Sequence, residues 1–291
     1  MTEMKNQMKK NKLFILGAED PEMVAIQQLI MKMDAGEFVY ACDPKGDRVI
    51  PSSAYGQTSI SEYKNNYEPI WENTDVYLVE CGNPGLPSSC NSITVIDHHH
   101  PGDSGYGKPP SKYWEASSIG QVYSVITSDQ PEEEYLMPEE EYLMIAAADH
   151  CLAAAYAGQC QDIDPMRLWC WRIIQRADFQ DRSYSEVRSD SEHAFWYVLH
   201  APKINLGGVE VADLRATFVP ELPEAACYLG VGYLSAVIDR DGRQKVVIGG
   251  CGEGTQPGKS PVETFLQEWG PAQGLTGLYG DPVRGFAGGY L

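Results

Sequence analysis

The chain has 291 residues and a formal net charge of −19 at pH 7. Hydrophobic residues make up 43% and charged residues 22%, which is ordinary for a globular protein and excludes wholesale disorder. The acidic balance argues against long duplex nucleic acid as a partner, because such binding relies on many Lys and Arg contacts to phosphate. No apolar run reaches the roughly 18 to 20 residues of a membrane span, so we expect a soluble protein with no membrane partner.

The sequence carries no signal that predicts export. Residues 1–12 are charged and rich in methionine, without the apolar core of a signal peptide. The eight cysteines include no CxxC pair, which is typical of reduced thiols rather than of disulfides or a zinc ribbon. We therefore expect a cytoplasmic protein. Its length allows two domains, and its oligomeric state stays open, with a homodimer among the possibilities.

A first strand is predicted at residues 13–17, followed directly by a helix. Asp20 suits the N-cap of this helix and Pro21 its first turn. Asp20 and Glu22 then have two possible roles. Either they cap the helix and complement its dipole, or they supply oxygen ligands to two adjacent metal ions at a strand end.

Two further strands are predicted at residues 38–41 and 75–79. The connection between them is longer than usual for a βα unit, so we expect a small insertion there. Glu80 follows the second of these strands and precedes a turn at Gly82. It is therefore a second carboxylate at a strand end.

Residues 92–96 are rich in Val, Ile and Thr and predict a buried strand that Pro101 and Gly102 end. The run from Asp97 to His100 then lies at the carboxyl end of a strand, where open α/β sheets bind ligands. Its oxygen and nitrogen donors suit Mn²⁺, Zn²⁺ or Fe²⁺ better than Ca²⁺. The alternative is a solvated polar turn without a function.

Two later segments bring further polar groups. Ser117 or Ser118 is predicted to cap a helix, with phosphate binding at that helix start as the alternative. Residues 142–151 predict an apolar helix that ends in Asp149 and His150. A buried carboxylate is costly unless it is paired or bound to metal, so Asp149 is a candidate ligand. His150 is expected to be a hydrogen-bonding neighbour only.

The sequence changes character between Ala201 and Leu206, where short β-like runs and glycines begin. An Asp-Gly turn within residues 239–243 predicts a hairpin. The glycine-rich tail at residues 279–290 contains Arg284, whose guanidinium could fork onto a phosphate. The alternative is a tightly turned terminus without a ligand. We place the domain boundary at residues 205 and 206.

The order of these motifs resembles the DHH phosphoesterase superfamily. This superfamily includes oligoribonucleases, phosphatases of small nucleotides, cyclic-dinucleotide phosphodiesterases and family II inorganic pyrophosphatases. Its signature matches Asp97-His98-His99, and its other acidic motifs match Asp20-Pro21-Glu22, Glu80 and Asp149. Glu replaces Asp at positions 22 and 80. Two positions depart further, since Leu16 stands where the family has a His, and Asp281 stands near the place of a C-terminal His.

The resemblance implies an α/β fold with a parallel-sheet DHH-type domain at residues 1–205 and a second, smaller α+β domain at 206–291. It implies two divalent ions, with Mn²⁺ expected and Mg²⁺, Fe²⁺ or Zn²⁺ as alternatives. The implied metal ligands are Asp20, Glu22, Glu80, Asp97, His98 and Asp149. His99 and Arg284 would contact the phosphate as catalytic residues. The implied activity is phosphoester hydrolysis in a small phosphorylated substrate, such as a nucleotide or a short oligonucleotide.

A second hypothesis belongs to a different class. Because Leu16 removes one nitrogen ligand, the chain could be a degenerate DHH-like protein that binds a nucleotide or a metal as a sensor or sequestering module. An NAD-binding protein is disfavoured, since no GxGxxG motif follows the first strand.

Overall fold

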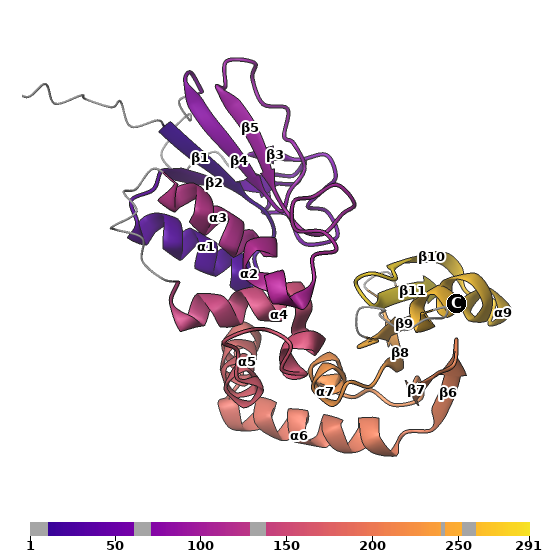
Figure 1. Cartoon of the computed structure of the whole chain (residues 1–291). Helices are drawn as coiled ribbons and strands as arrows, with labels where there is room; N and C mark the ends of the chain where they lie inside the picture. Colours follow the sequence, from indigo (N-terminus) through magenta and orange to yellow (C-terminus); the bar gives the residue numbers. More distant parts are fainter. Residues whose placement is uncertain (1–10, 61–70, 129–137, 240–241, 252–259) are drawn as a thin grey trace, which may run out of the picture. The chain divides into compact units, whose positions relative to one another are not determined.

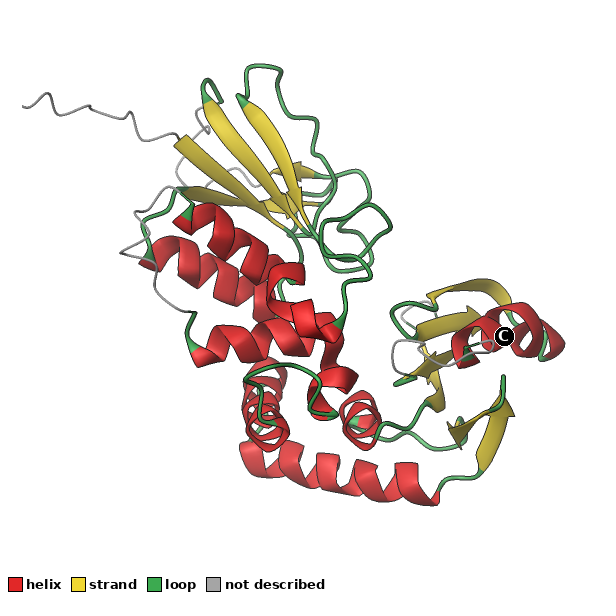
Figure 2. Cartoon of the chain, viewed as in Figure 1, coloured by secondary structure: helices red, strands yellow, loops and turns green. Residues whose placement is uncertain are grey.

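The computed structural model describes residues 11–60, 71–128, 138–239, 242–251 and 260–291. The chain divides into two compact units of nearly equal length, residues 1–150 and 151–291. The protein is mixed α/β, with two sheets of which one is mostly parallel (Figures 1 and 2). Within the described ranges no helix is long and apolar enough to cross a membrane.

The first unit is built on a five-stranded sheet with the order β3-β2-β1-β4-β5. Its strands are β1 (Asn11–Leu16), β2 (Glu37–Cys42), β3 (Ser59–Ile60), β4 (Thr74–Val79) and β5 (Ser92–Ile96). All neighbouring pairs are parallel except β2 with the short β3. The carboxyl ends of β1, β4 and β5 therefore meet at one edge of the sheet, which confirms the expected strand-end placement of the polar motifs.

Helices α1 (Pro21–Lys32) and α3 (Ser118–Thr127) lie side by side against the sheet (Figure 1). Leu13 and Ile15 of β1 instead pack with Val49 and Ala54 from the connection after β2. The remaining helical segments of this unit are η1 (Pro110–Lys112), α2 (Tyr113–Ala116) and α4 (Glu140–Tyr156). The backbone of α4 is non-helical at Cys151, so the helix is kinked there.

The expectation of a buried strand at residues 92–96 is wrong, because β5 lies at the edge of the sheet. Ile93 and Val95 are 46% and 49% exposed, and Ile96 is the one buried residue of the strand. A β-branched run predicts a strand, but it does not tell whether another strand lies beyond it. The polar residues that follow are nevertheless buried, as Asp97 and His98 are 1% and 4% exposed.

The second unit contains a six-stranded sheet with the order β10-β11-β9-β8-β7-β6. Its strands are β6 (Lys203–Leu206), β7 (Val209–Leu214), β8 (Tyr233–Ile238), β9 (Gln244–Gly249), β10 (Thr276–Asp281) and β11 (Phe286–Tyr290). All neighbouring pairs are antiparallel except β7 with β8. The amide of Asp239 donates to the carbonyl of Arg243 at 2.9 Å, which confirms the predicted hairpin. Residues 240 and 241 lie outside the described part.

Helices pack on both faces of this second sheet. The helical segments are α5 (Pro165–Gln180), α6 (Tyr184–His200), α7 (Leu222–Leu229), α8 (Pro261–Thr264), η3 (Phe265–Trp269) and α9 (Gly270–Ala272). Val198 of α6 and Ala225 of α7 pack with Leu214 on one face. Phe265 of η3 packs with Ile248 on the other.

The expected boundary at residues 205 and 206 falls within β6, the first strand of the second sheet, but the compact second unit begins at Cys151. Two buried acids at the start of α7 form ion pairs with arginines of α5. Arg172 pairs with Glu224 at 2.9 Å, and Arg176 pairs with Glu221. Since these helices belong with the second sheet, the second unit is not markedly smaller than the first.

Candidate metal centre

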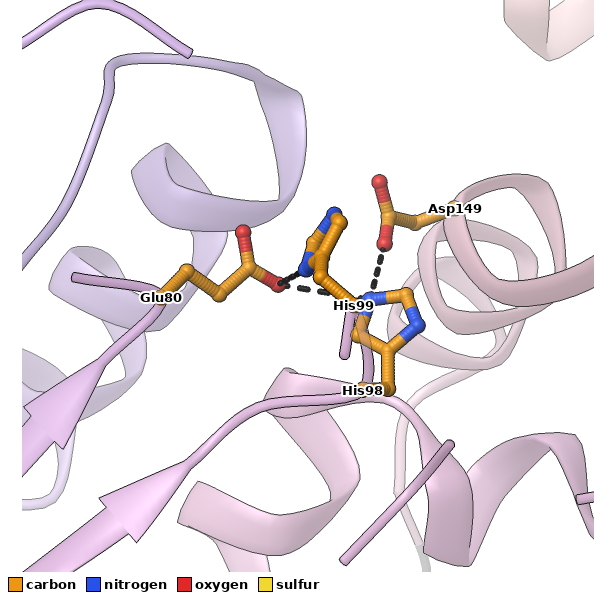
Figure 3. A group of neighbouring side chains, drawn as sticks. All are labelled: Glu80, His98, His99 and Asp149. Carbon is orange, nitrogen blue, oxygen red and sulfur yellow. Dashed lines mark ion pairs between the residues drawn. The ribbon is translucent and has the colours of Figure 1, made fainter. Parts of the chain in front are cut away.

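Four side chains of the first unit converge beyond the ends of β4 and β5 (Figure 3). Glu80, His98, His99 and Asp149 each offer one ligand atom, and these atoms lie within 4.8 Å of one another. Glu80 follows β4 directly, the two histidines follow β5, and Asp149 comes from α4. The sheet therefore brings together motifs that are far apart in the sequence.

Glu80 has a backbone conformation that few residues adopt. Its φ is +50°, in the left-handed region, where a residue other than glycine is strained. The Glu80 amide donates to the carbonyl of Ile96 at 3.0 Å, and Ser118 Oγ donates to Glu80 Oε1 at 2.7 Å. Backbone strain at a strand end, together with a fixed carboxylate, is typical of a functional position.

The His98 imidazole is buried, with 2% of its side chain exposed, and it faces two carboxylates. Its Nε2 lies 2.7 Å from Asp149 Oδ2 and 3.3 Å from Glu80 Oε1. Neither approach has hydrogen-bond geometry, so His98 Nε2 and Asp149 Oδ2 stay without a hydrogen-bond partner among the described residues. Buried polar atoms are rarely left in this state. Ligand atoms that lie this close together without a hydrogen bond between them fit a bound cation.

The electrostatics of this group also favour a positive charge. Burial alone would lower the pKa of His98, but Asp149 and Glu80 outweigh burial and raise it to about 10. Burial would raise the pKa of Asp149, but His98 and His99 outweigh it and hold the pKa well below its usual range. The carboxylates thus stabilise a cation beside them, which either a proton on His98 or a divalent metal ion supplies.

Glu22 lies next to the same group and adds a further carboxylate. It is 2% exposed, its Oε1 accepts from the amide of Ile119 at 2.9 Å, and its Oε2 has no hydrogen-bond partner in the described part. Burial, with Asp149 and Glu80 close by, raises the pKa of Glu22 well above its usual value. Its unsatisfied oxygen and the nearby acids make Glu22 a further candidate ligand, although it is outside the set whose ligand atoms lie within 4.8 Å of one another.

Asp20 has the capping role that its sequence position allowed, and its role as a metal ligand stays a prediction. Its Oδ1 accepts from the amide of Met23 at 2.8 Å, so it is the N-cap of α1. Burial, followed by Asp149 and Glu80, also raises the pKa of Asp20 to about 7, so it lies within electrostatic reach of the group formed by Glu80, His98, His99 and Asp149.

Asp97 does not join this group, although it was predicted to be a ligand. Its Oδ1 accepts from the amides of His98 and His99 at 2.7 and 2.9 Å, and His99 Nδ1 lies 2.8 Å from the same oxygen. Its Oδ2 accepts from the Tyr55 hydroxyl at 2.8 Å. Burial would raise the pKa of Asp97, but His99 and Tyr55 hold it below its usual value. The carboxylate therefore orients the His99 ring.

A second, looser set of possible ligands surrounds Asp97. Asp97, His100 and Asp103 also have ligand atoms within 4.8 Å of one another. His100 is exposed, and Asp103 Oδ2 accepts from its backbone amide at 2.6 Å. The first group is the stronger candidate for holding a cation, because its His98 Nε2 and Asp149 Oδ2 are buried atoms without a hydrogen-bond partner in the described part of the chain.

Residues at the start of α3 donate hydrogen bonds to Glu80 and Glu22, a role that the sequence did not predict. Ser117 is the N-cap, as expected, and accepts from the amide of Gly120 at 3.2 Å. Ser118 instead donates to Glu80, and the next amide donates to Glu22. No local pattern identifies these contacts, because the partners are 38 and 97 positions apart.

Leu16 stands at the end of β1, at the position where a histidine was expected from the resemblance. It is completely buried and offers no ligand atom. The amide of the next residue, Gly17, donates to the carbonyl of Val79 at 2.9 Å, so this strand end is tied to β4 by its backbone. Position 16 therefore contributes no side-chain donor, and the predicted ligands that follow this strand end, Asp20 and Glu22, lie at the start of α1.

Arg284 belongs to the second unit and lies in the turn between β10 and β11. Its side chain is exposed, and its guanidinium lies 5.7 Å from the ring centroid of Phe286. A Cβ at Gly288 would collide with the ring of Tyr279, so this glycine serves close packing between strands. The described contacts of Arg284 are within its own unit, and its contact with phosphate stays a prediction.

A scan against protein-family models gives no match, and a search of the curated proteins gives none either. The resemblance to the DHH superfamily therefore rests on the motifs named above.

Proposed function

We propose that this protein is a divalent-metal-dependent phosphohydrolase whose centre is formed by Glu22, Glu80, His98 and Asp149. The observation that carries the proposal is the buried His98 Nε2, 2.7 Å from Asp149 Oδ2 without hydrogen-bond geometry. One imidazole and several carboxylate oxygens suit Mn²⁺, with Mg²⁺, Fe²⁺ and Zn²⁺ as alternatives. The mostly parallel sheet and the second mixed sheet are compatible with a DHH-type organisation, which is part of the proposal.

A divalent ion at this position would lower the pKa of a bound water and neutralise charge on phosphoryl oxygens. The residues around it have separate tasks. Ser118 and the amide of Ile119 fix the two glutamates. Asp97, itself held by Tyr55, fixes His99 through Nδ1 and leaves Nε2 to meet a substrate oxygen.

The proposed substrate is a small phosphorylated molecule, such as a nucleotide or a short oligonucleotide. The net charge of −19 disfavours a long polyanion, whereas a metal ion reverses the charge locally and admits a phosphate. Arg284 of the second unit is proposed as a further phosphate contact, since a guanidinium fork matches phosphate geometry.

The test uses metal-depleted protein reloaded with Mn²⁺ and a panel of phosphomonoesters, nucleotides and oligonucleotides of two to five residues. Wild type should release phosphate or mononucleotide only when Mn²⁺ is present, and His98→Ala should release neither. Stoichiometric Mn²⁺ without turnover of any substrate in the panel would contradict the proposal.

A second candidate function is supported by one observation, the buried Leu16 in place of a nitrogen donor. In that case the chain is a degenerate relative that binds a nucleotide and leaves it intact. Recovery of the bound nucleotide unchanged from the Mn²⁺-loaded protein would favour this candidate over the hydrolase.

A further inference from the structure

Arg48 is the one arginine in the sequence of residues 1–150, and it lies beside the strand end that lacks a histidine. Its Nε donates to the carbonyl of Gly17 at 3.0 Å, and its guanidinium lies 4.0 Å from the ring centroid of Tyr40. The backbone of Arg48 forms a bridge with Cys42, so it is anchored at the edge of β2. The guanidinium is therefore held in place by backbone and ring contacts.

Two nitrogens of this guanidinium are poorly satisfied. Nη1 lies 3.7 Å from Glu19 Oε2, and the Glu19 side chain is 67% exposed, so this ion pair is loose. Nη2 is buried and has no hydrogen-bond partner among the described residues. A buried charged donor without an acceptor is costly, because it loses its hydration and gains nothing in return. Its position is explained if an acceptor comes from a ligand.

Gly17 links Arg48 to the metal-ligating group. A Cβ at Gly17 would collide with the carbonyl of Glu80, so the Gly17 backbone lies directly against that residue. Asp20, which is within electrostatic reach of Glu80 and Asp149, is also within reach of Arg48. The guanidinium is thus next to the acidic side of the centre.

We propose that Arg48 supplies the positive charge on the Leu16 side of the centre, in place of a second metal ion, and that Nη2 donates to an oxygen of the substrate's phosphoryl group. This inference rests on the proposed function, because it places the substrate's phosphoryl group at the metal ion that Glu80 and His98 are proposed to bind. A guanidinium is suited to that task, since it stays charged when buried and presents several donors to one phosphate.

The competing explanation is that Arg48 only fastens β2 to the end of β1. Loss of the side chain would then reduce stability and leave phosphate and metal binding unchanged. The two explanations differ in a ligand affinity that can be measured without turnover.

The experiment measures binding of inorganic phosphate to the Mn²⁺-loaded protein, and separately the binding of Mn²⁺ itself, by titration calorimetry. Arg48→Gln keeps a donor for Gly17 and removes the charge, and Arg48→Met removes both. Lys112→Gln is the matched control, because it removes an exposed cation of the same unit that is paired with Glu115 at 3.0 Å.

Arg48→Gln and Arg48→Met should each weaken phosphate binding about tenfold or more, because a charged hydrogen bond is lost. The first Mn²⁺ should bind as in wild type, whereas a second Mn²⁺ should bind about tenfold more tightly, because a neighbouring cation is gone. Lys112→Gln should change none of these affinities. If neither neutral variant unfolds cooperatively, Arg48→Lys decides, with an expected loss of about threefold in phosphate affinity.

Unchanged phosphate affinity in a cooperatively folded Arg48 variant overturns this inference and leaves the proposed function standing. Wild type that binds no Mn²⁺ overturns both. The two failures are therefore distinguishable in one set of titrations.

Discussion

The two sides of the candidate centre differ in what the chain provides. On the side of β4 and β5, Glu80, His98 and Asp149 have ligand atoms close together, buried and in part unsatisfied. On the side of β1, the corresponding strand end has a buried Leu16 and the guanidinium of Arg48 near Gly17. Both are carboxyl ends of strands in one parallel sheet. Strand-end position therefore makes a site possible, but the individual side chains decide whether a cation is bound there.

Removing a ligand from the β4 and β5 side should have the largest effect. His98→Ala and Asp149→Ala should each abolish Mn²⁺ binding and Mn²⁺-dependent hydrolysis, since each removes a donor from a small set. Thermal unfolding should stay cooperative, because these residues serve the site and not the core. His100→Ala is the control, as His100 is exposed and outside the group, and should bind Mn²⁺ like wild type. Wild-type Mn²⁺ affinity in either ligand variant would contradict the assignment.

Ser117 and Ser118, at the start of α3, give a second test of the β4 and β5 side. Ser118→Ala should weaken Mn²⁺ binding about 10- to 100-fold, because Glu80 loses the hydroxyl that orients it. Ser117→Ala, one residue away, removes only the N-cap of α3 and should cost about 1 kcal/mol of stability. Calorimetric titration and thermal unfolding separate the two effects. Equal loss of Mn²⁺ affinity in both variants would show that the serines act through the helix as a whole.

The pH dependence tests whether His98, on the β4 and β5 side, holds a proton when no metal is bound. With a pKa of about 10, His98 in the folded metal-free protein keeps a proton that the unfolded chain loses above 6.5. Its contribution to stability is therefore present below about pH 6.5 and disappears as the pH rises through 10.

Mn²⁺ has to displace that proton, so its affinity should rise about tenfold per pH unit below the pKa of His98. The raised pKa of Asp20, about 7, should steepen this slope at lower pH. The measurement is a set of Mn²⁺ titrations between about pH 6 and about pH 8. A flat dependence would mean that His98 is not a ligand.

Adding a nitrogen donor on the β1 side should have the smallest effect of these changes. Leu16→His should strengthen binding of a second Mn²⁺ by about tenfold, the lower end of what one supporting group changes. The effect is limited because Leu16 is completely buried and Arg48 repels a cation nearby. Mn²⁺ titration gives the affinity, and a thermal scan shows whether the buried imidazole is tolerated. No gain in a folded variant would place the second cation elsewhere.

Much of the framework could be predicted because its signals are local. Apolar periodicity and capping residues predicted α1 with its N-cap Asp20. Turn residues predicted the end of β4 before Glu80 and the hairpin between β8 and β9. The order of the motifs also indicated that Asp149 meets the histidines. These features depend on neighbouring residues, which a single sequence displays.

What could not be predicted depends on contacts between distant segments. The edge position of β5 depends on which strand pairs with it, and the turn of Asp97 towards Tyr55 depends on a loop 42 positions earlier. No sequence motif identifies the contact of Arg48 with Gly17, because the two residues are 31 positions apart. The attachment of α5 to the second unit likewise follows from buried ion pairs with α7, and that of α6 from apolar packing of Val198 with Ala225.

The central claim is that His98 supplies the nitrogen ligand of the metal, while His99 faces the substrate. Electron spin echo envelope modulation of the Mn²⁺-loaded protein measures this directly, because it detects imidazole nitrogen bound to the ion. One coordinated nitrogen is predicted in wild type, retained in His99→Ala and lost in His98→Ala. Absence of nitrogen coupling in wild type, or its loss in His99→Ala with retention in His98→Ala, would contradict the assignment.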